Sequence, residues 1–151
     1  MINNRINKTI TQIICTVCVI VLTGCSTFNI SKESLVTQLE KNQKVGNRYN
    51  ILTFPIIITE YPSNNLKKIK CVNEDGKLVW LYPDKNTQFM ITRKSDSTSV
   101  VKAYFDTLIL QSDTLYGLRS RILGGIRKIP VDDIYKVEIY AEFANTENIS
   151  K

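Results

Sequence analysis

The sequence predicts a mainly β protein, in which a small antiparallel, barrel-like sheet follows one short N-terminal helix. Two tight-turn signals support this prediction, Asp75-Gly76 and Gly124-Gly125, because such pairs adopt the positive backbone angles of two-residue hairpin turns. Lysines also alternate with apolar residues over 66–72, a pattern typical of a sheet with one face in water. A chain of 151 residues is expected to form a single domain of this kind.

The N-terminus has the pattern of an export signal. Arg5 and Lys8 precede an apolar run at 13–22, which is the charged-then-apolar order of a secretory signal peptide. The run has 10 residues, whereas a helix needs about 20 to cross the hydrocarbon of a bilayer. We therefore expect this segment to be removed, and we do not expect it to remain as a membrane span.

The run closes on Leu22-Thr23-Gly24-Cys25, which resembles the lipobox of bacterial lipoproteins. The resemblance implies that residues 1–24 are a signal peptide that is removed, and that the Cys25 thiolate takes a diacylglyceryl group. Cys25 would then be the first residue of a chain held on a membrane by its acyl chains. The residue after it is Ser26 and not aspartate, which by the same resemblance implies the outer membrane, facing the periplasm. The alternative is an ordinary signal peptide that happens to end in Gly-Cys.

Composition excludes several classes of function. The mature chain, residues 25–151, has 18 basic and 14 acidic side chains, and this net charge of +4 falls short of the basic surface of a nucleic-acid binder. The chain has no histidine, which excludes Ser-His-Asp and Cys-His nucleophile pairs and histidine zinc sites. Cys15 and Cys18 leave with the signal, so Cys71 is the one unmodified cysteine, and we expect it to be buried in a strand. We expect no cofactor and no metal.

The mature chain divides into four predicted segments. Residues 25–30 are expected to be a tether, and 31–46 a short helix capped by Ser31 with an apolar stripe at Leu35 and Leu39. Residues 49–143 are expected to be a single β domain, and 144–151 a flexible tail. Pro55 interrupts the first β segment, which favours an edge strand or an irregular entry. The predicted strands lie at 51–59, 66–72, 77–82, 87–94, 98–110, 114–123, 126–129 and 134–143.

The strand and turn order over 87–142, with the segments YFDTL at 104–108, LYG at 115–117 and IPVDDI at 129–134, resembles the small Sm-like and SH3-like β-barrels. The resemblance implies a five-stranded barrel, which protects its edges by curling on itself. Two features depart from the family: the long strand contains no glycine, and the RNA-binding loop signatures of Sm proteins are absent. No RNA-binding residue is carried over, because a fold alone does not imply a function.

One cluster of side chains points to binding. If Leu123 faces Ile126 across the Gly-Gly turn, like charges face each other in the ladder, and an anionic partner would relieve their repulsion. Candidate partners are an envelope protein, an anionic lipid or a glycan, since arginine suits carboxylate and phosphate alike; a solvated hairpin is the alternative. The predicted binding residues are Arg119, Arg121, Arg127 and Lys128.

The predicted function is that of a lipid-anchored, non-catalytic binding or assembly module of the cell envelope. One alternative is an acid-only hydrolase acting on cell-wall glycan, and the other is a purely structural lipoprotein. Hydrolysis by acids alone would need two carboxylates that converge in a cleft, and linear spacing does not show such convergence. The acids near turns are Asp106, Asp113, Asp132 and Asp133.

Overall fold

The computed structural model describes residues 25–42, 45–53 and 56–149. The predicted signal peptide, residues 1–24, lies outside these ranges. Among the residues described, no helix has both the length and the apolar character needed to cross a bilayer. The strands are β1 Ser26–Ile30, β2 Gly46–Thr53, β3 Ile56–Ser63, β4 Ile69–Val72, β5 Leu78–Tyr82, β6 Gln88–Arg93, β7 Val100–Tyr104, β8 Ile109–Gln111, β9 Thr114–Ser120, β10 Gly124–Pro130, β11 Ile134–Ala141 and β12 Asn145–Asn148; the helices are α2 Lys32–Lys41 and the 3₁₀ turns η1 Phe105–Thr107 and η2 Val131–Asp133.

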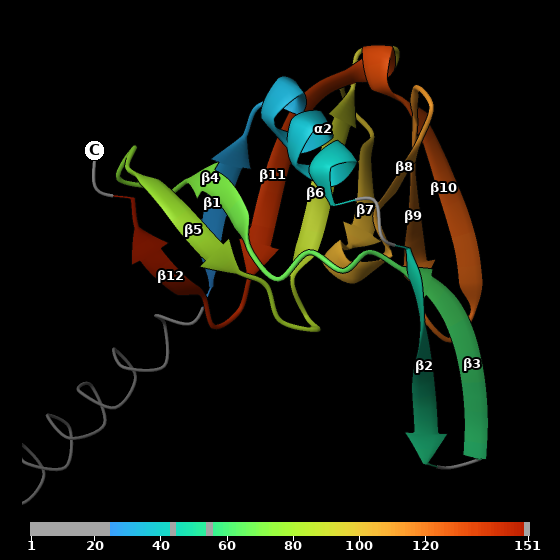
Figure 1. Cartoon of the computed structure of the whole chain (residues 1–151). Coiled ribbons are helices and arrows are strands. Elements are labelled where there is room, and N and C mark those ends of the chain that lie inside the picture. Colours follow the sequence, from blue (N-terminus) through green and yellow to red (C-terminus); the bar gives the residue numbers. More distant parts are fainter. Residues whose placement is uncertain (1–24, 43–44, 54–55, 150–151) are drawn as a thin grey trace, which may run out of the picture.

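The predicted mainly β, antiparallel fold is confirmed. A seven-stranded sheet has the order β12-β5-β4-β1-β11-β6-β7, a second sheet has the order β10-β9-β8, and β2 pairs only with β3 (Figure 1). The Asp-Gly hairpin forms as expected, with Val72 opposite Leu78 and Gly76 at a φ of 75°. Within the described residues, the sheets remain open and do not close into a barrel.

The core lies between the large sheet and the elements that cover it. Phe89, Ile91 and Ile139 are fully buried side chains of neighbouring strands. Helix α2 lies across one face of this sheet and buries Leu35 and Leu39 against it (Figure 1). Each fully buried side chain of this size contributes about 1.5–3 kcal/mol relative to exposure.

Helix α2 begins as the sequence predicts. The Ser31 side chain accepts a hydrogen bond from the Ser34 N–H at 3.1 Å, which satisfies one of the free donors of the first turn. The helix ends at Lys41, earlier than the predicted 46, and Gly46 is the first residue of β2.

The predicted tether at 25–30 and the predicted tail at 144–151 are wrong where the chain is described. Residues Ser26–Ile30 form β1, which lies between β4 and β11 in the middle of the large sheet. Phe28 and Ile30 point into the core, as alternate residues of a strand do. This pattern was not recognised in the sequence, because the segment has only five residues and lies beside the expected cleavage site. Residues Asn145–Asn148 form β12, which pairs with the outer edge of β5.

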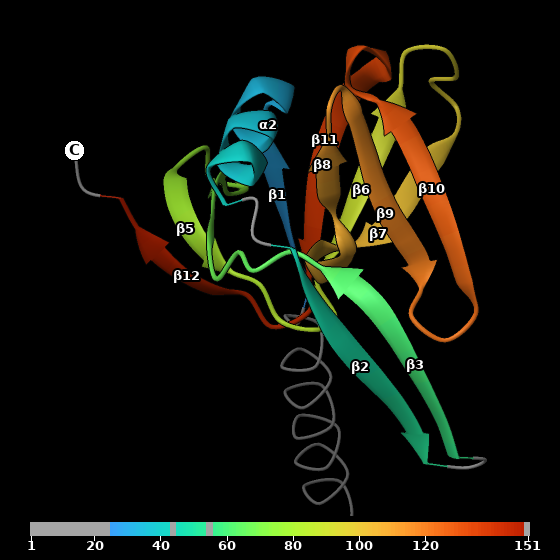
Figure 2. The same ribbon diagram turned by 45° about the vertical axis from the view of Figure 1, so that its right-hand side comes forward.

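The segment predicted as one interrupted strand at 51–59 is instead part of a two-stranded hairpin. Strands β2 and β3 pair in register from Gly46 opposite Ser63 to Thr53 opposite Ile56. The hairpin, which we call the arm, projects from the body of the protein in both views (Figures 1 and 2). Pro55, which was predicted to interrupt the strand, lies outside the described residues.

The predicted long strand at 98–110 is broken by η1. The Leu108 N–H bonds the Phe105 carbonyl at 3.1 Å, which tightens the chain into a 3₁₀ turn between β7 and β8. The Asn64 side-chain amide donates to the carbonyls of both residues, at 2.6 and 2.9 Å, and so holds the turn against the start of the β3–β4 connection. This turn places Asp106 inside the protein.

Candidate functional site

A groove of about 710 Å³ lies along β7 and β10. We call it the basic groove, because the charged residues that line it are all cations. They are Arg93, Lys102, Arg119, Arg127 and Lys128. Three of the four binding residues predicted from the sequence are therefore brought together here, and Lys102 and Arg93 join them from β7 and β6.

A close approach of two strands shapes this groove. A Cβ added to Gly117 of β9 would lie 2.6 Å from the Cβ of Ala103 of β7, so only glycine permits this contact. Arg127 is the cross-strand partner of Gly117, and directly opposed residues share a face of a sheet. Arg119, two residues after Gly117, points to that same face. The guanidinium groups of Arg119 and Arg127 therefore lie on the face of β9 and β10 that meets β7, beside the contact between Gly117 and Ala103.

The charges in the groove are unequally compensated. Arg93 donates through Nε to the Asp133 carboxylate at 2.6 Å, and the Lys128 Nζ lies 5.5 Å from the centre of the Tyr116 ring. Over the described ranges, Lys102, Arg119 and Arg127 form no ion pair with an acidic residue. In the described part of the chain, four of the five cations that line the groove, Lys128 included, therefore have no acidic partner.

The predicted hairpin register is wrong. Lys128 pairs with Tyr116 and Gly124 pairs with Ser120, so Arg121 has no cross-strand partner and lies in the turn. The Ser120 hydroxyl accepts hydrogen bonds from the N–H groups of Ile122 and Leu123, at 3.2 and 3.0 Å. These bonds stabilise a turn that begins directly after Ser120, before the two glycines. The like-charge repulsion predicted across the ladder is therefore absent.

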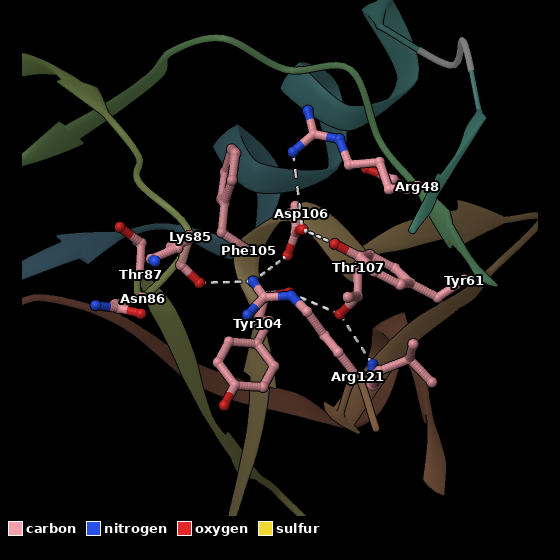
Figure 3. Close-up of polar contacts among 12 residues, drawn as sticks. Arg48, Tyr61, Lys85, Asn86, Thr87, Tyr104, Phe105, Asp106, Thr107 and Arg121 are labelled. Atoms are coloured by element: carbon pink, nitrogen blue, oxygen red, sulfur yellow. Dashed lines mark hydrogen bonds and ion pairs between the residues drawn. The ribbon is translucent and has the colours of Figure 1, made fainter. Parts of the chain in front are cut away.

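Arg121 also departs from its predicted role, because its side chain turns into the protein and is only 13% exposed. Its Nη2 lies 2.6 Å from Oδ1 of Asp106 and donates to the Lys85 carbonyl at 2.6 Å (Figure 3). The guanidinium stacks 3.8 Å from the centre of the Tyr104 ring. Arg121 is therefore an internal structural cation and does not line the basic groove.

Asp106 is the centre of a cluster that joins the arm to the body. It accepts a hydrogen bond from the Tyr61 hydroxyl at 2.9 Å, and Nη1 of Arg48 lies 3.8 Å from its Oδ2 (Figure 3). Burial, and then the hydrogen bond to Asp106, raise the pKa of Tyr61. We call Arg48, Tyr61, Asp106 and Arg121 the arm-base cluster. A further bond from the Thr59 hydroxyl to the Arg121 carbonyl, at 2.8 Å, links the arm to the β9–β10 turn.

The acids predicted for the alternative hydrolase do not meet in one place. Asp106 lies in η1, and Asp132 and Asp133 lie in η2, at the opposite end of the body (Figure 1). The backbone N–H of Ser95 bonds Asp133 and, together with Arg93, lowers its pKa. Asp113 is exposed in the turn before β9. Within the described residues, no group of three or more cysteine, aspartate or glutamate side chains is arranged to hold a metal ion.

The two cysteines in the described part of the chain have opposite environments. Cys71 is 2% exposed, as predicted, and burial raises the pKa of its thiol to about 12. Cys25 is exposed and directly precedes β1. A hydrogen bond to Cys25 raises the pKa of Tyr140, which lies in β11 opposite Thr27.

A second groove, of about 750 Å³, lies between α2 and β4. Lys68 places its Nζ 4.4 Å from the centre of the Trp80 ring at this groove, and Glu33 contributes a compensating negative charge. We call it the helix groove. Its other cations are Lys41, Lys67 and Lys70. Because it contains an acid as well as lysines, it is the weaker candidate for binding an anion.

The sequence did not predict the two groove residues outside the hairpin, Arg93 and Lys102. The residues around Lys102 in sequence do not indicate that it lines a groove, because only the crossing of β7 and β9 brings it near Arg119. Six strands, β6 to β11, lie over 87–142 where five were predicted, because η1 divides the long strand. The described sheets stay open, and the resemblance to Sm-like barrels stays a prediction. Comparisons with models of known protein families, with curated proteins and with solved structures found no match.

Proposed function

We propose that this chain is a lipid-anchored, non-catalytic docking module of the cell envelope, and that its basic groove binds carboxylate or phosphate groups of another envelope component. The observation that supports this function is the convergence of Lys102, Arg119 and Arg127 in one groove without an acidic partner. The lipid anchor itself rests on the lipobox-like segment that ends at Cys25.

The chemistry of the groove suits an anion that carries several charges. Arginine presents a planar fork of donors that matches carboxylate and phosphate oxygens, and Arg119 and Arg127 supply two such forks on one face. A multivalent anion gains from each cation it meets, and the uncompensated positive field also speeds its approach. A neutral ligand would gain nothing from this field.

A binding titration with a matched control tests the proposal. The purified acylated protein is titrated against fluorescently labelled polyphosphate and labelled poly-glutamate, and anisotropy is measured at low and high salt. The variant Lys102→Ser/Arg119→Ser/Arg127→Ser is expected to bind at least about tenfold more weakly, since exposed ion pairs contribute up to about 1 kcal/mol each. The comparison of the two polymers separates phosphate recognition from carboxylate recognition.

The control removes the same charge from the helix groove, in Lys41→Ser/Lys67→Ser/Lys68→Ser. Equal weakening in both variants would show that only net charge matters and would contradict the proposal. In cells, crosslinking of the anchored protein should recover a partner that the basic-groove variant loses and the control keeps. Release of sugar fragments from cell-wall glycan by the purified protein, lost in Asp106→Asn, would instead favour the hydrolase alternative.

A further inference from the structure

We propose that the outer end of the arm enters the lipid–water interface of the membrane to which Cys25 is attached. This inference rests on the lipid anchor of the proposed function, and it adds a second membrane contact made by protein side chains. No residue of the arm lines the basic groove.

The outer end of the arm is apolar and uncharged. Residues 50–59 contain no charged side chain. Ile56 is 77% exposed, and Ile51 and Ile58, which pair with each other, are exposed as well. A soluble surface hairpin normally carries charges at such positions, because exposed apolar strands promote aggregation.

Apolar side chains on both faces of the arm indicate that lipid, and not a protein partner, covers its outer end. The pair Ile51–Ile58 and the next pair, Leu52–Ile57, point to opposite faces, because successive pairs alternate along a hairpin. Ile57 is also exposed, so apolar side chains leave both faces of the outer end. A protein partner that docks on one face would leave the other face in water. A lipid phase surrounds both faces at once.

The arm projects toward the anchored end of the molecule. It runs past the end of the body at which β1 begins (Figures 1 and 2). Cys25 directly precedes β1, and β1 is hydrogen-bonded on both sides, to β4 and β11. Because no free chain separates the acylated residue from the sheet, the anchor determines which end of the protein faces the bilayer. The arm then extends to the same side.

Other features support this orientation. Phe143 is exposed just after β11, whose Ala141 pairs with Ser26 beside the anchor. The exposed Leu123 lies in the β9–β10 turn, which Thr59 ties to the arm through the Arg121 carbonyl. The arm-base cluster ties the arm to the body through the bond from Tyr61 to Asp106.

Backbone hydrogen bonding limits the depth of insertion. The outer edges of β2 and β3 have no strand neighbour in the described sheets, and unsatisfied backbone groups are very unfavourable in hydrocarbon. The arm therefore stops at the boundary of headgroups and acyl chains, where water still reaches its edges. Tyr49 marks that boundary, because its hydroxyl lies 3.4 Å from Glu60 and its ring is exposed beside the isoleucines.

A depth measurement tests the inference. The full-length protein is expressed, acylated and reconstituted in vesicles after Ile56→Cys is labelled with the fluorophore NBD. Labelling is specific, because Cys71 is buried and acylation blocks Cys25. We expect a blue shift on reconstitution and strong quenching by lipids with a doxyl group near the headgroup. A label at Asp132→Cys, exposed at the far end of the body, should show neither.

An NBD spectrum at position 56 that stays water-like in an acylated, anchored protein would overturn the inference. A blue shift that doxyl lipids do not quench, but that grows with the density of protein in the membrane, would also overturn it and would assign the arm to a second copy of the chain. Mass spectrometry of the N-terminal peptide reports acylation of Cys25 separately. Quenching at position 56 in a protein that begins at Ser26, and so has neither an acyl group nor the thiol of Cys25, would support the arm contact independently of the lipid anchor.

Discussion

The guanidinium of Arg121 lies 2.6 Å from the carboxylate of Asp106 at the base of the arm, where Asp106 is buried and the Arg121 side chain is 13% exposed. The pair links η1 to the β9–β10 turn, and Tyr61 and Arg48 extend it to the arm. One residue predicted to bind a partner and one weighed as a catalytic acid are therefore each other's counter-ion. The stability of this pair decides how firmly the arm is held.

Arg121→Ala is expected to lower the free energy of unfolding by about 3–5 kcal/mol, because the buried Asp106 carboxylate then keeps only the more distant, half-exposed Arg48 as a cation. Urea unfolding followed by circular dichroism measures the loss. Arg119→Ala, an exposed arginine two residues away, should change the same quantity by less than about 0.5 kcal/mol. Equal losses in the two variants would contradict the structural role of Arg121.

Gly117→Ala is expected to destabilise the protein by about 1–3 kcal/mol, because the added methyl group would lie 2.6 Å from the Ala103 Cβ. The double variant Gly117→Ala/Ala103→Gly should recover part of this loss, since the opposing methyl group is removed. Leu108 keeps the recovery incomplete, because its Cδ2 lies 3.1 Å from the new Cβ. A double-mutant cycle with no coupling energy would show that β7 and β9 do not meet here.

Cys71 is expected to resist thiol reagents in the native protein at pH 8, because burial raises its pKa to about 12 and keeps it protonated. A chromogenic disulfide reagent should detect no thiol before unfolding and one afterwards. Because the native pKa exceeds the unfolded value of about 8.5, this thiol contributes stability below pH 8.5 that is lost as the pH rises toward 12. Peptide mapping would locate any reactive native thiol: a labelled Cys71 would contradict the prediction, whereas a labelled Cys25 would show that Cys25 is not acylated.

Asp133→Asn is expected to destabilise the protein at pH 7 but to have little effect in acid. The bonds from Ser95 and Arg93 lower the pKa of Asp133, so its contribution is present above the unfolded value of about 3.9 and is lost as the pH falls through the native pKa. Asp132→Asn is the matched control, because that neighbouring carboxyl is exposed. The melting temperatures of the two variants are compared from pH 7 to pH 2. If the destabilisation by Asp133→Asn were the same at every pH, the stabilising role of the ionised Asp133 carboxylate would be contradicted.

A linker of ten glycine and serine residues, inserted directly after Cys25 and beginning with serine, is expected to reduce lipid quenching at position 56 and to leave membrane attachment unchanged. Such a linker has an end-to-end distance of about 5–6 Å × √n for n residues, which frees the body from a fixed orientation. An insertion of equal length after Ser97, in the exposed β6–β7 connection, is the control. Unchanged quenching would show that the arm itself, and not the anchor, orients the protein.

Local signals predicted the local structure. The Asp-Gly pair specified the β4–β5 hairpin, and a serine before an apolar stripe specified the start of α2. The burial of Cys71 followed from its place in a strand in which lysines alternate with apolar residues. In each case the determining groups lie within a few residues of one another, where turn chemistry and periodicity act.

Long-range pairing was not visible in the sequence. Residues Ser26–Ile30 looked like a tether because the strands that bury Phe28 come much later in the chain. The predicted β9–β10 register was wrong because the Ser120 hydroxyl, and not the glycines alone, stabilises the turn. The basic groove was predicted in part, since Arg119 and Arg127 are close in sequence whereas Lys102 reaches them only through packing.

The place of β1 has a consequence for the order in which the protein folds. The first residues after Cys25 pair with β11, which is made more than a hundred residues later, so the centre of the large sheet cannot close until nearly the whole chain is available. Pairings of such sequence separation form slowly. If Cys25 carries the proposed lipid anchor, the wait for β11 gives the acylating and cleaving enzymes a period in which the strand beside Cys25 is not yet paired.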